Sequence, residues 1–325
     1  MKRITYFRQL FFSFLIITLA SCDCSDDDQH TLVSQTELNK AIVKTNVINV
    51  ATGLHAIYQS SFNTGSALED ISRHFINGAR FFDDKSGYLF IETLDEAYVI
   101  AHIKEDWIGT SRIHAQDANG KYHVQELLEI INTSGFGFSQ YYLENPSTGL
   151  IEAKTSFVSG IRDVPWFIGS GYYGHHSAPY YTEKESKSLL IKDLTRTIAG
   201  GIGSVINAYL SSETDATAFC RSFIDRIRFF DDRSGYFFIY NTEGLCIAHG
   251  TQKEQEGENQ WDLKDVKDNY VLRDIIDVVN SNTDGGYYSY YWWNPSKDKI
   301  EPKTAFAMKI PGTDYFIGTG IYHED

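Results

Sequence analysis

Two matched sets of side chains are spaced along this chain so that each could bind a small carboxylate. Such a site needs a fixed cation, preferably the planar guanidinium of arginine, together with hydroxyl and imidazole donors and apolar walls. Each half of the chain offers an arginine, a histidine, a lysine and two tyrosines. The candidates are Arg80, Tyr88, His102, Tyr141 and Lys154 in the first half, and Arg228, Tyr236, His249, Tyr290, Trp292 and Lys303 in the second.

The same side chains also have structural explanations, which the sequence alone leaves open. The two arginines could pair with acids close to them in the chain, namely Asp83, Asp84, Asp231 and Asp232. The histidines could be hydrogen-bonded core residues, the lysines could lie at a solvated strand edge, and the tyrosines could pack with satisfied hydroxyls. We expect the second set to form the better pocket, for a small anionic or zwitterionic metabolite, with Arg228 as the anion contact. Asp231, Asp232 or Asp265 could instead neutralise its cations.

The chain repeats itself with a period of roughly 148 residues, which is the length of a whole domain rather than of a solenoid unit. The run Arg-Phe-Phe-Asp-Asp-Lys-Ser-Gly-Tyr at 80–88 returns at 228–236 with arginine in place of Lys85. Ile-Ala-His at 100–102 also returns, at 247–249. We therefore predict two similar domains, the first module at 31–174 and the second module at 183–325, joined by a linker at 175–182.

Hydrophobic spacing predicts the same elements in each module. Apolar residues recur at three- and four-residue steps over 43–58 and 190–210, which indicates a long helix at the start of each module. Three glycines, Gly200, Gly201 and Gly203, are expected to weaken and kink the second of these helices. Shorter helices are expected near 75–76 and 223–224 and over 124–131 and 271–279. Strands fill the rest, the last at 166–173 and 315–322, so the predicted fold class is α+β with a long N-terminal helix beside an antiparallel sheet.

A fixed order of motifs runs through the second module. Arg-Phe precedes a turn and Gly-Tyr-Phe-Phe-Ile, and Ala-His closes the next strand. Gly-Gly-Tyr-Tyr-Ser-Tyr-Tyr-Trp follows at 285–292, then Pro-Lys-Thr-Ala-Phe at 302–306 and Tyr-Phe-Ile-Gly-Thr-Gly-Ile-Tyr at 315–322. This order resembles the Cache superfamily, specifically the single-Cache type 2 module of bacterial chemoreceptors and sensor kinases, over nearly all of both modules. The resemblance implies two PAS-like domains and a pocket for a small carboxylate such as acetate, propionate or pyruvate.

Three features depart from the family pattern. Ile103 and Gly250 follow the strand-end histidines, where the family usually has proline, and the first module has Leu-Glu at 143–144 where the second has Trp-Trp. Family members usually lead into a transmembrane helix and a signalling domain, whereas only a few residues follow the second module here. We therefore expect a binding or sensing protein that acts through a separate signalling or transport partner. The alternative is a non-catalytic interaction or scaffold protein with vestigial pockets.

The first residues have the pattern of a lipoprotein signal peptide. Basic Lys2, Arg3 and Arg8 precede an apolar run that ends in Leu-Ala-Ser-Cys at 19–22. This ending resembles a bacterial lipobox, so we expect residues 1–21 to be removed and Cys22 to carry acyl chains such as palmitate. The acidic stretch at 22–30 would form a solvated tether. The expected location is the cell envelope, with the protein lipid-anchored to a membrane and facing the periplasm or the cell surface.

Charge and motif content exclude several classes of function. The formal net charge of −14 would repel nucleic acid, so no nucleic-acid partner is expected. The sequence has no phosphate loop, no Gly-x-Ser-x-Gly and no His-Glu-x-x-His motif. We therefore expect no enzymatic activity, no cofactor and no metal site. Cys220 and Cys246 both lie in the second module and could form one disulfide.

Overall fold

The computed structural model describes residues 32–62, 64–174 and 178–324. The predicted signal peptide, Cys22, the tether and part of the predicted linker therefore lie outside the described residues. Along the chain the elements are β1 (Val33–Ser34), α1 (Gln35–Tyr58), α2 (Ala67–Gly78), β2 (Leu89–Thr93), β3 (Val99–Ala101), η1 (Glu105–Trp107), α3 (His123–Ser134), β4 (Phe136–Glu144), β5 (Ile151–Gly160), β6 (Trp166–Tyr173), β7 (Tyr180–Tyr181), α4 (Glu183–Ala208), α5 (Glu213–Ile224), β8 (Phe238–Asn241), β9 (Cys246–His249), η2 (Lys253–Gln255), α6 (Val271–Ser281), β10 (Gly286–Asn294), β11 (Lys299–Lys309) and β12 (Tyr315–Tyr322).

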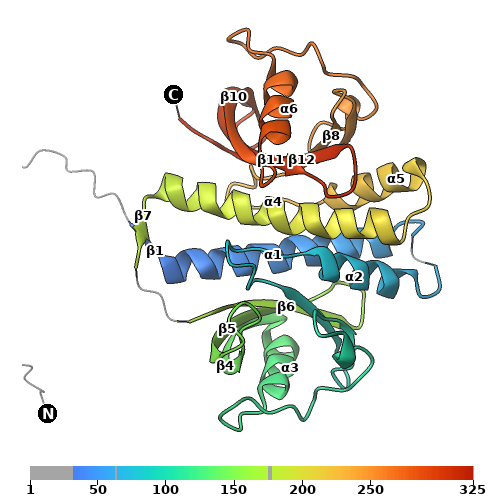
Figure 1. Cartoon of the computed structure of the whole chain (residues 1–325), viewed down its shortest axis with the longest axis vertical. Helices are drawn as coiled ribbons and strands as arrows, with labels where there is room; N and C mark the ends of the chain where they lie inside the picture. The colour runs from blue at the N-terminus through green and yellow to red at the C-terminus, as the bar shows by residue number, and fades with distance from the viewer. Residues whose placement is uncertain (1–31, 63, 175–177, 325) are drawn as a thin grey trace, which may run out of the picture. The chain divides into compact units, whose positions relative to one another are not determined.

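Each module folds around one five-stranded antiparallel sheet. The strand order is β3-β2-β6-β5-β4 in the first module and β9-β8-β12-β11-β10 in the second, so corresponding strands take the same places in both. The long helices α1 and α4 run side by side between the two sheets (Figure 1). The predicted α+β class, with a long helix and an antiparallel sheet in each module, is confirmed, and the module boundaries at 31–174 and 183–325 stay a proposal.

The two faces of each sheet carry different helices. One face packs on the long helix of its own module, with α1 on β5 and β6 and α4 on β11 and β12. The other face, which we call the outer face, is covered by α3 in the first module and by α6 in the second. Because successive residues of a strand point to opposite faces, every second strand residue points to the outer face. The clusters that form there are separate from the main core.

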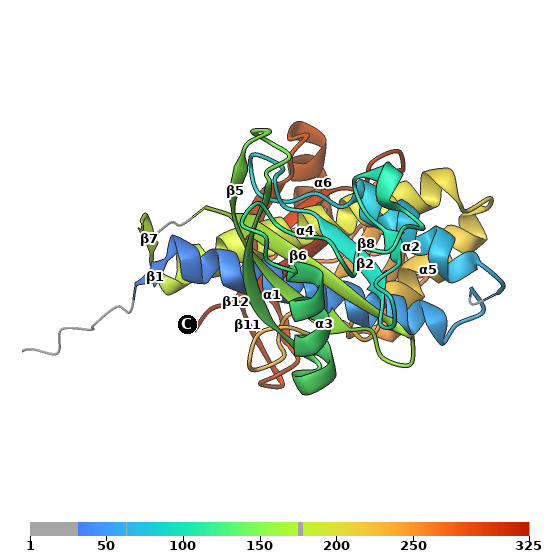
Figure 2. The same ribbon diagram turned by 90° about the horizontal axis from the view of Figure 1, so that it is seen from below.

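Both long helices begin earlier than their hydrophobic spacing indicates, because each has a capping box. The Ser34 side chain accepts the backbone N–H of Glu37, and the Glu37 carboxylate accepts the backbone N–H of Ser34. Thr182 and Glu185 make the same reciprocal pair at the start of α4. A capping box satisfies backbone donors that the first helical turn leaves free. The strands β1 and β7 pair just before these caps and hold the starts of the two helices together, and α1 and α4 run in the same direction from there (Figure 2).

The helix α4 is continuous from Glu183 to Ala208, so the three glycines do not interrupt it, and the kink stays a prediction. Its glycines make close contacts between elements instead. A Cβ atom on Gly200 would lie 2.4 Å from the carbonyl oxygen of Gly78 at the end of α2, and one on Gly203 would lie 2.8 Å from that of Pro311. Only a residue without a side chain permits such an approach.

The modules pack against each other through a reciprocal contact. The ring of Phe75 in α2 lies against Gly201 of α4, and the ring of Phe223 in α5 lies against Gly53 of α1. The two rings also stack on each other, with centroids 4.8 Å apart. Equivalent residues of the two modules thus exchange equivalent contacts, as in an isologous interface between identical subunits. A single hydrophobic core therefore spans both modules.

The segment predicted as a linker is partly ordered, since Tyr180 and Tyr181 form β7. The disulfide considered for the second module is not formed, because Cys220 in α5 and Cys246 in β9 are both buried free thiols. Burial raises the pKa of each thiol to about 12, so both stay protonated and behave as small apolar side chains.

Candidate functional site

A buried lysine forms the centre of the site in the second module. Lys303 comes from β11, its residue is only 1% exposed, and its ammonium lies 2.8 Å from the hydroxyl of Tyr236. The Tyr236 hydroxyl lies 3.0 Å from that of Tyr322, which donates to the backbone carbonyl of Trp293. Because Tyr322 gives its only hydroxyl proton to this carbonyl, its oxygen accepts the proton of Tyr236. The Tyr236 oxygen in turn accepts a hydrogen bond from Lys303. The ammonium also lies over the Tyr236 ring, 4.0 Å from its centroid, where the ring quadrupole attracts a cation.

Lys303 has no acidic partner among the described residues. Its ammonium lies near the hydroxyl of Tyr236 and the rings of Phe238 and Tyr322. Burial holds the pKa of Lys303 well below its ordinary value. Of the acids considered as neutralising partners, Asp265 and Asp232 are engaged elsewhere and Asp231 is exposed. Asp265 accepts three backbone N–H groups, and Asp232 accepts the N–H of Ser234. Burial without a counter-ion disfavours the charged form of the lysine, and a bound anion would restore that charge and pair with it, so this position favours an anion.

His249 supplies a neutral donor beside this lysine. It ends β9, is buried, and its ring centroid lies 5.2 Å from that of Tyr236. The Nδ1 atom accepts the backbone N–H of Gln252 at 2.9 Å and that of Thr251 at 3.3 Å, which leaves the ring proton on Nε2. Burial, followed by the charge of Lys303, lowers the pKa of His249 to about 3. The imidazole therefore stays uncharged at physiological pH, with an N–H to donate.

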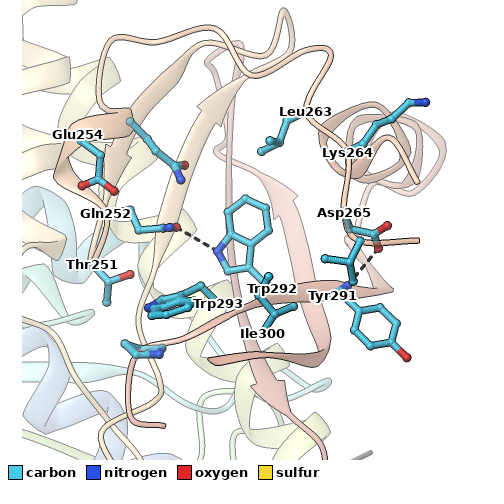
Figure 3. Close-up of a pocket in the computed structure, with 13 residues that line it drawn as sticks. Thr251, Gln252, Glu254, Leu263, Lys264, Asp265, Tyr291, Trp292, Trp293 and Ile300 are labelled. Carbon is cyan, nitrogen blue, oxygen red and sulfur yellow. Dashed lines mark hydrogen bonds between the residues drawn. The ribbon is translucent and has the colours of Figure 1, made fainter. Parts of the chain in front are cut away.

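A pocket of about 540 Å³ opens next to this cluster, between β10 and the loop that follows β9 (Figure 3). Trp292 stands in it and donates its indole N–H to the side-chain oxygen of Gln252 at 3.1 Å. Burial raises the pKa of Tyr236 to about 12, and the neighbouring side chains of Tyr322, Thr251 and Trp292 act in the opposite direction. Since Thr251 and Trp292 line the pocket and also contact Tyr236, only one layer of side chains separates the pocket from the buried lysine.

Both candidate arginines donate to backbone carbonyls, and a role for either in binding an anion stays a prediction. The Arg228 guanidinium donates to the backbone carbonyls of Asp225, Ile227 and Gly250. In the first module, Arg80 likewise donates to the carbonyls of two residues just before it, Ile76 and Ala79. Neither arginine makes the alternative pair with a neighbouring aspartate among the described residues. Asp83 pairs instead with two cations of α4, Lys192 and Arg196.

The first module repeats the buried lysine and its tyrosine. The Lys154 ammonium lies 2.7 Å from the Tyr88 hydroxyl, the residue is 1% exposed, and burial lowers its pKa to about 7. Tyr88 lies 3.3 Å from the hydroxyl of Tyr173, which donates to a backbone carbonyl. His102 accepts the backbone N–H of Lys104 at Nδ1, so it too keeps its proton on Nε2. The structure thus brings together the lysine, tyrosine and histidine predicted for each module.

The remaining predicted tyrosines lie beside the lysines on the neighbouring strand. Tyr141 pairs across the sheet with Lys154, and Tyr290 pairs in the same way with Lys303. Both rings are buried on the outer face, and the Tyr141 hydroxyl is 2.8 Å from that of Ser156. Sequence reasoning missed Tyr173 and Tyr322, whose hydroxyls complete the chain from each lysine. Their signal was present, since both end the last strand of a repeated motif.

Within residues 32–62, 64–174 and 178–324, no group of three histidine, cysteine, aspartate or glutamate side chains is arranged to hold a metal ion. Over the same ranges, no helix has the length and apolar character that crossing a membrane requires.

Each of the two sheets carries a buried lysine and converging polar donors on its outer face, an arrangement suited to a small-ligand site. The chain belongs to the Single Cache domain 2 family, which it matches over residues 35–176 and 193–325. Cache domains are extracytoplasmic sensory modules that bind small ligands.

Three relatives each match less than half of the chain. A sensor histidine kinase, MctS of Rhizobium johnstonii (strain DSM 114642 / LMG 32736 / 3841), is 32% identical over 93 residues, which are 29% of this chain and 20% of the kinase. The chain thus aligns with about a fifth of that relative's length. A methyl-accepting chemotaxis protein from Vibrio parahaemolyticus RIMD 2210633 is 26% identical over 43% of this chain and 90% of its own, with a TM-score of 0.37. A Cache chemosensory domain described for carboxylic acid recognition is 22% identical over 43% of this chain and 94% of its own, with a TM-score of 0.36.

Proposed function

We propose that this protein is a lipid-anchored extracytoplasmic sensor whose second module binds a small carboxylate at Lys303. The single observation that carries the proposal is the buried Lys303 ammonium, which has hydroxyl and ring neighbours but no acidic partner among the described residues. A carboxylate there would supply the missing counter-charge and accept hydrogen bonds from Lys303 and from the Nε2–H of His249. The Cache chemosensory domain described for carboxylic acid recognition is consistent with this chemistry, and MctS, a sensor histidine kinase, is consistent with a sensory role.

The other candidate residues take roles around the lysine in this proposal. Tyr236 would turn its hydroxyl proton from Tyr322 to the carboxylate, and Tyr290 and Trp292 would form the walls that enclose the rest of the ligand. Arg228 would act as a positioning residue, because its guanidinium holds the carbonyl of Gly250 at the start of the loop that carries Thr251. Entry would require Trp292 to move, since its indole stands between the pocket and Tyr236.

The anchor and the output are parts of the same proposal. Lipid on Cys22 would hold the protein to a membrane, and occupancy would be passed to a separate signalling or transport protein. The parallel pair of α1 and α4 is the element such a partner could read, because each helix packs on the sheet of its own module and on the other helix. A change in either sheet would therefore reach the shared helix pair.

A thermal-shift screen of small carboxylates, amines and sugars on the mature full-length protein tests the function. A ligand at a hundredfold excess over its dissociation constant should stabilise the protein by about 2.7 kcal/mol, which is several degrees of melting temperature. We expect monocarboxylates to give such a shift. If no compound of any class stabilises the protein, the alternative of an interaction or scaffold protein with vestigial pockets is favoured.

A further inference from the structure

Glu92 of β2 is a buried acid whose carboxylate lacks a full set of partners. The residue is 5% exposed, and its Oε2 atom makes no hydrogen bond with any described residue. Burial raises the pKa of Glu92 to about 8, with the nearby Arg112 acting in the opposite direction. Buried polar groups are hydrogen-bonded in nearly all native proteins, so an unpartnered one calls for a specific explanation.

Glu92 points to the same face of the sheet as the site. Phe90, two residues earlier on β2, belongs to the cluster under α3, whereas Leu89 and Ile91 belong to the main core. By strand alternation Glu92 shares the face of Phe90 and therefore of Lys154, whose ammonium lies 5.7 Å from the Phe90 ring centroid. The charge of Glu92 also acts on the pKa of Tyr141, which pairs across the sheet with Lys154.

The second module has no acid at the equivalent place. Glu92 pairs with Phe167 of the last strand, and Tyr240 pairs with the corresponding Phe316, so Tyr240 takes the position of Glu92. The Tyr240 hydroxyl donates to Gln255. Three further polar positions of the first module's outer face are also changed: His123, Ser139 and Ser156 correspond to Val271, Tyr288 and Ala305. Two of the three, His123 and Ser139, carry a buried polar atom without a described partner. The modules thus share the lysine end of the site and differ in the rest of it.

We propose that the first module binds an elongated zwitterion, with its carboxylate at Lys154 and its ammonium at Glu92, and so recognises a different ligand from the second module. An ammonium would give Oε2 of Glu92 the donor that it lacks and would stabilise the charged form of this carboxyl group. The Lys154 ammonium lies against Tyr88, and Glu92 lies four positions after Tyr88, about 13 Å along an extended strand. The side chains of Lys154 and Glu92 span only part of that distance, so the ligand must be elongated. The inference rests on the proposed function, because it takes the lysine end to bind a carboxylate.

Calorimetry on the full-length mature protein tests the inference with two matched pairs of ligands. The pairs are 5-aminopentanoate with hexanoate, and 4-aminobutanoate with pentanoate, in which a methyl group replaces the ammonium. Lys303→Met removes the cation of the second module, so that the first module is measured alone. On this background Glu92→Gln keeps the volume of the side chain and removes its charge. Tyr240→Phe, at the equivalent position of the second module, is the matched control.

We expect the Lys303→Met protein to bind at least one amino acid of these pairs at least tenfold more tightly than its methyl counterpart. Glu92→Gln should abolish that preference, and Tyr240→Phe should leave it intact. If the Lys303→Met protein binds neither amino acid, or binds each amino acid no better than its counterpart, the inference is wrong. An unchanged preference in Glu92→Gln would also overturn it.

The inference and the proposed function fail in different ways. If hexanoate or another monocarboxylate binds the wild type and is lost in Lys303→Met, while neither amino acid binds the first module, only the inference is wrong. If no carboxylate binding depends on Lys303 or on Lys154, the proposed function fails as well. The melting temperatures of all variants identify any that do not fold. Lys154→Met removes the proposed carboxylate contact of the first module and so tests binding there by a second substitution.

Discussion

The ammonium of Lys303 lies 2.8 Å from the hydroxyl of Tyr236, and its counterpart Lys154 lies 2.7 Å from the hydroxyl of Tyr88. In both modules the lysine also lies above the ring of that tyrosine, at 4.0 Å and 3.9 Å from its centroid. The two sites keep this contact although much of the surrounding outer face differs between them. A buried lysine that contacts a hydroxyl and a ring but no acidic side chain favours the binding of an anion, which would supply the counter-charge.

Lys154 should make the stability of the protein depend on pH in a defined window. Its pKa is lowered to about 7 from an ordinary 10.5, so between these values the folded protein binds fewer protons than the unfolded chain. Stability attributable to this lysine therefore rises as the pH increases from about 7 to 10.5, and its unfavourable effect is largest below pH 7. We expect Lys154→Met to stabilise the ligand-free protein most at pH 7 and least at pH 10.

Urea unfolding of wild type and Lys154→Met at several pH values measures this difference, and Lys40→Met, an exposed substitution in α1, is the control. A stability difference between wild type and Lys154→Met that stays constant from pH 7 to pH 10 would show that the lysine keeps its ordinary pKa.

Arg228 should matter for stability more than for ligand affinity. Its guanidinium holds three backbone carbonyls, two of them within the turn before Phe229 and one at Gly250. Arg228→Ala leaves these carbonyls without a charged donor, so we expect the free energy of unfolding to fall by about 1–3 kcal/mol. Arg226→Ala, at an exposed position two residues away, should have little effect. A variant with unchanged stability that no longer binds carboxylates would instead make Arg228 the anion contact.

The contact of Gly200 with Gly78 should be essential for the packing of α2 on α4. A Cβ atom at either position would meet the other's carbonyl oxygen, at 2.4 Å for Gly200 and 2.2 Å for Gly78. Alanine favours a helix over glycine by about 1 kcal/mol, yet we expect Gly200→Ala to destabilise the protein by about 1–3 kcal/mol because the helices must separate. Equilibrium unfolding measures this, with Lys184→Ala at an exposed site of α4 as the control. Stabilisation by Gly200→Ala would mean that the two helices are not in close contact.

The repeat and the periodic spacing were enough to predict the class of fold. The last strands, at 166–173 and 315–322, were predicted at their observed bounds. Helical spacing also located α3 and α6, because an amphipathic helix on a sheet shows one apolar stripe. The start of α1 was missed because Ser34 and Glu37 set it through hydrogen bonds, whereas hydrophobic periodicity reports only the packed face.

The sequence was less informative about the contacts of individual polar groups. It placed a lysine, a tyrosine and a histidine in each candidate site, and these do lie together. It could not show that the Arg228 guanidinium is occupied by carbonyls, because backbone acceptors leave no mark in a residue pattern. Gly200 was read as a helix-weakening residue, since propensity is local whereas its contact with Gly78 joins residues far apart in the chain. Glu92 escaped notice because its burial depends on the strand order.

The central claim is that the buried ammonium of Lys303 binds the carboxylate of the ligand. Isothermal titration calorimetry tests it most directly, with the monocarboxylate that stabilises the wild type most in the thermal-shift screen. The comparison is between Lys303→Met and Lys309→Met, two substitutions on β11, the second of which is exposed. We predict that Lys309→Met binds as tightly as the wild type and that Lys303→Met loses at least a hundredfold in affinity while remaining folded. Equal affinity in the folded Lys303→Met protein and the wild type would contradict the account.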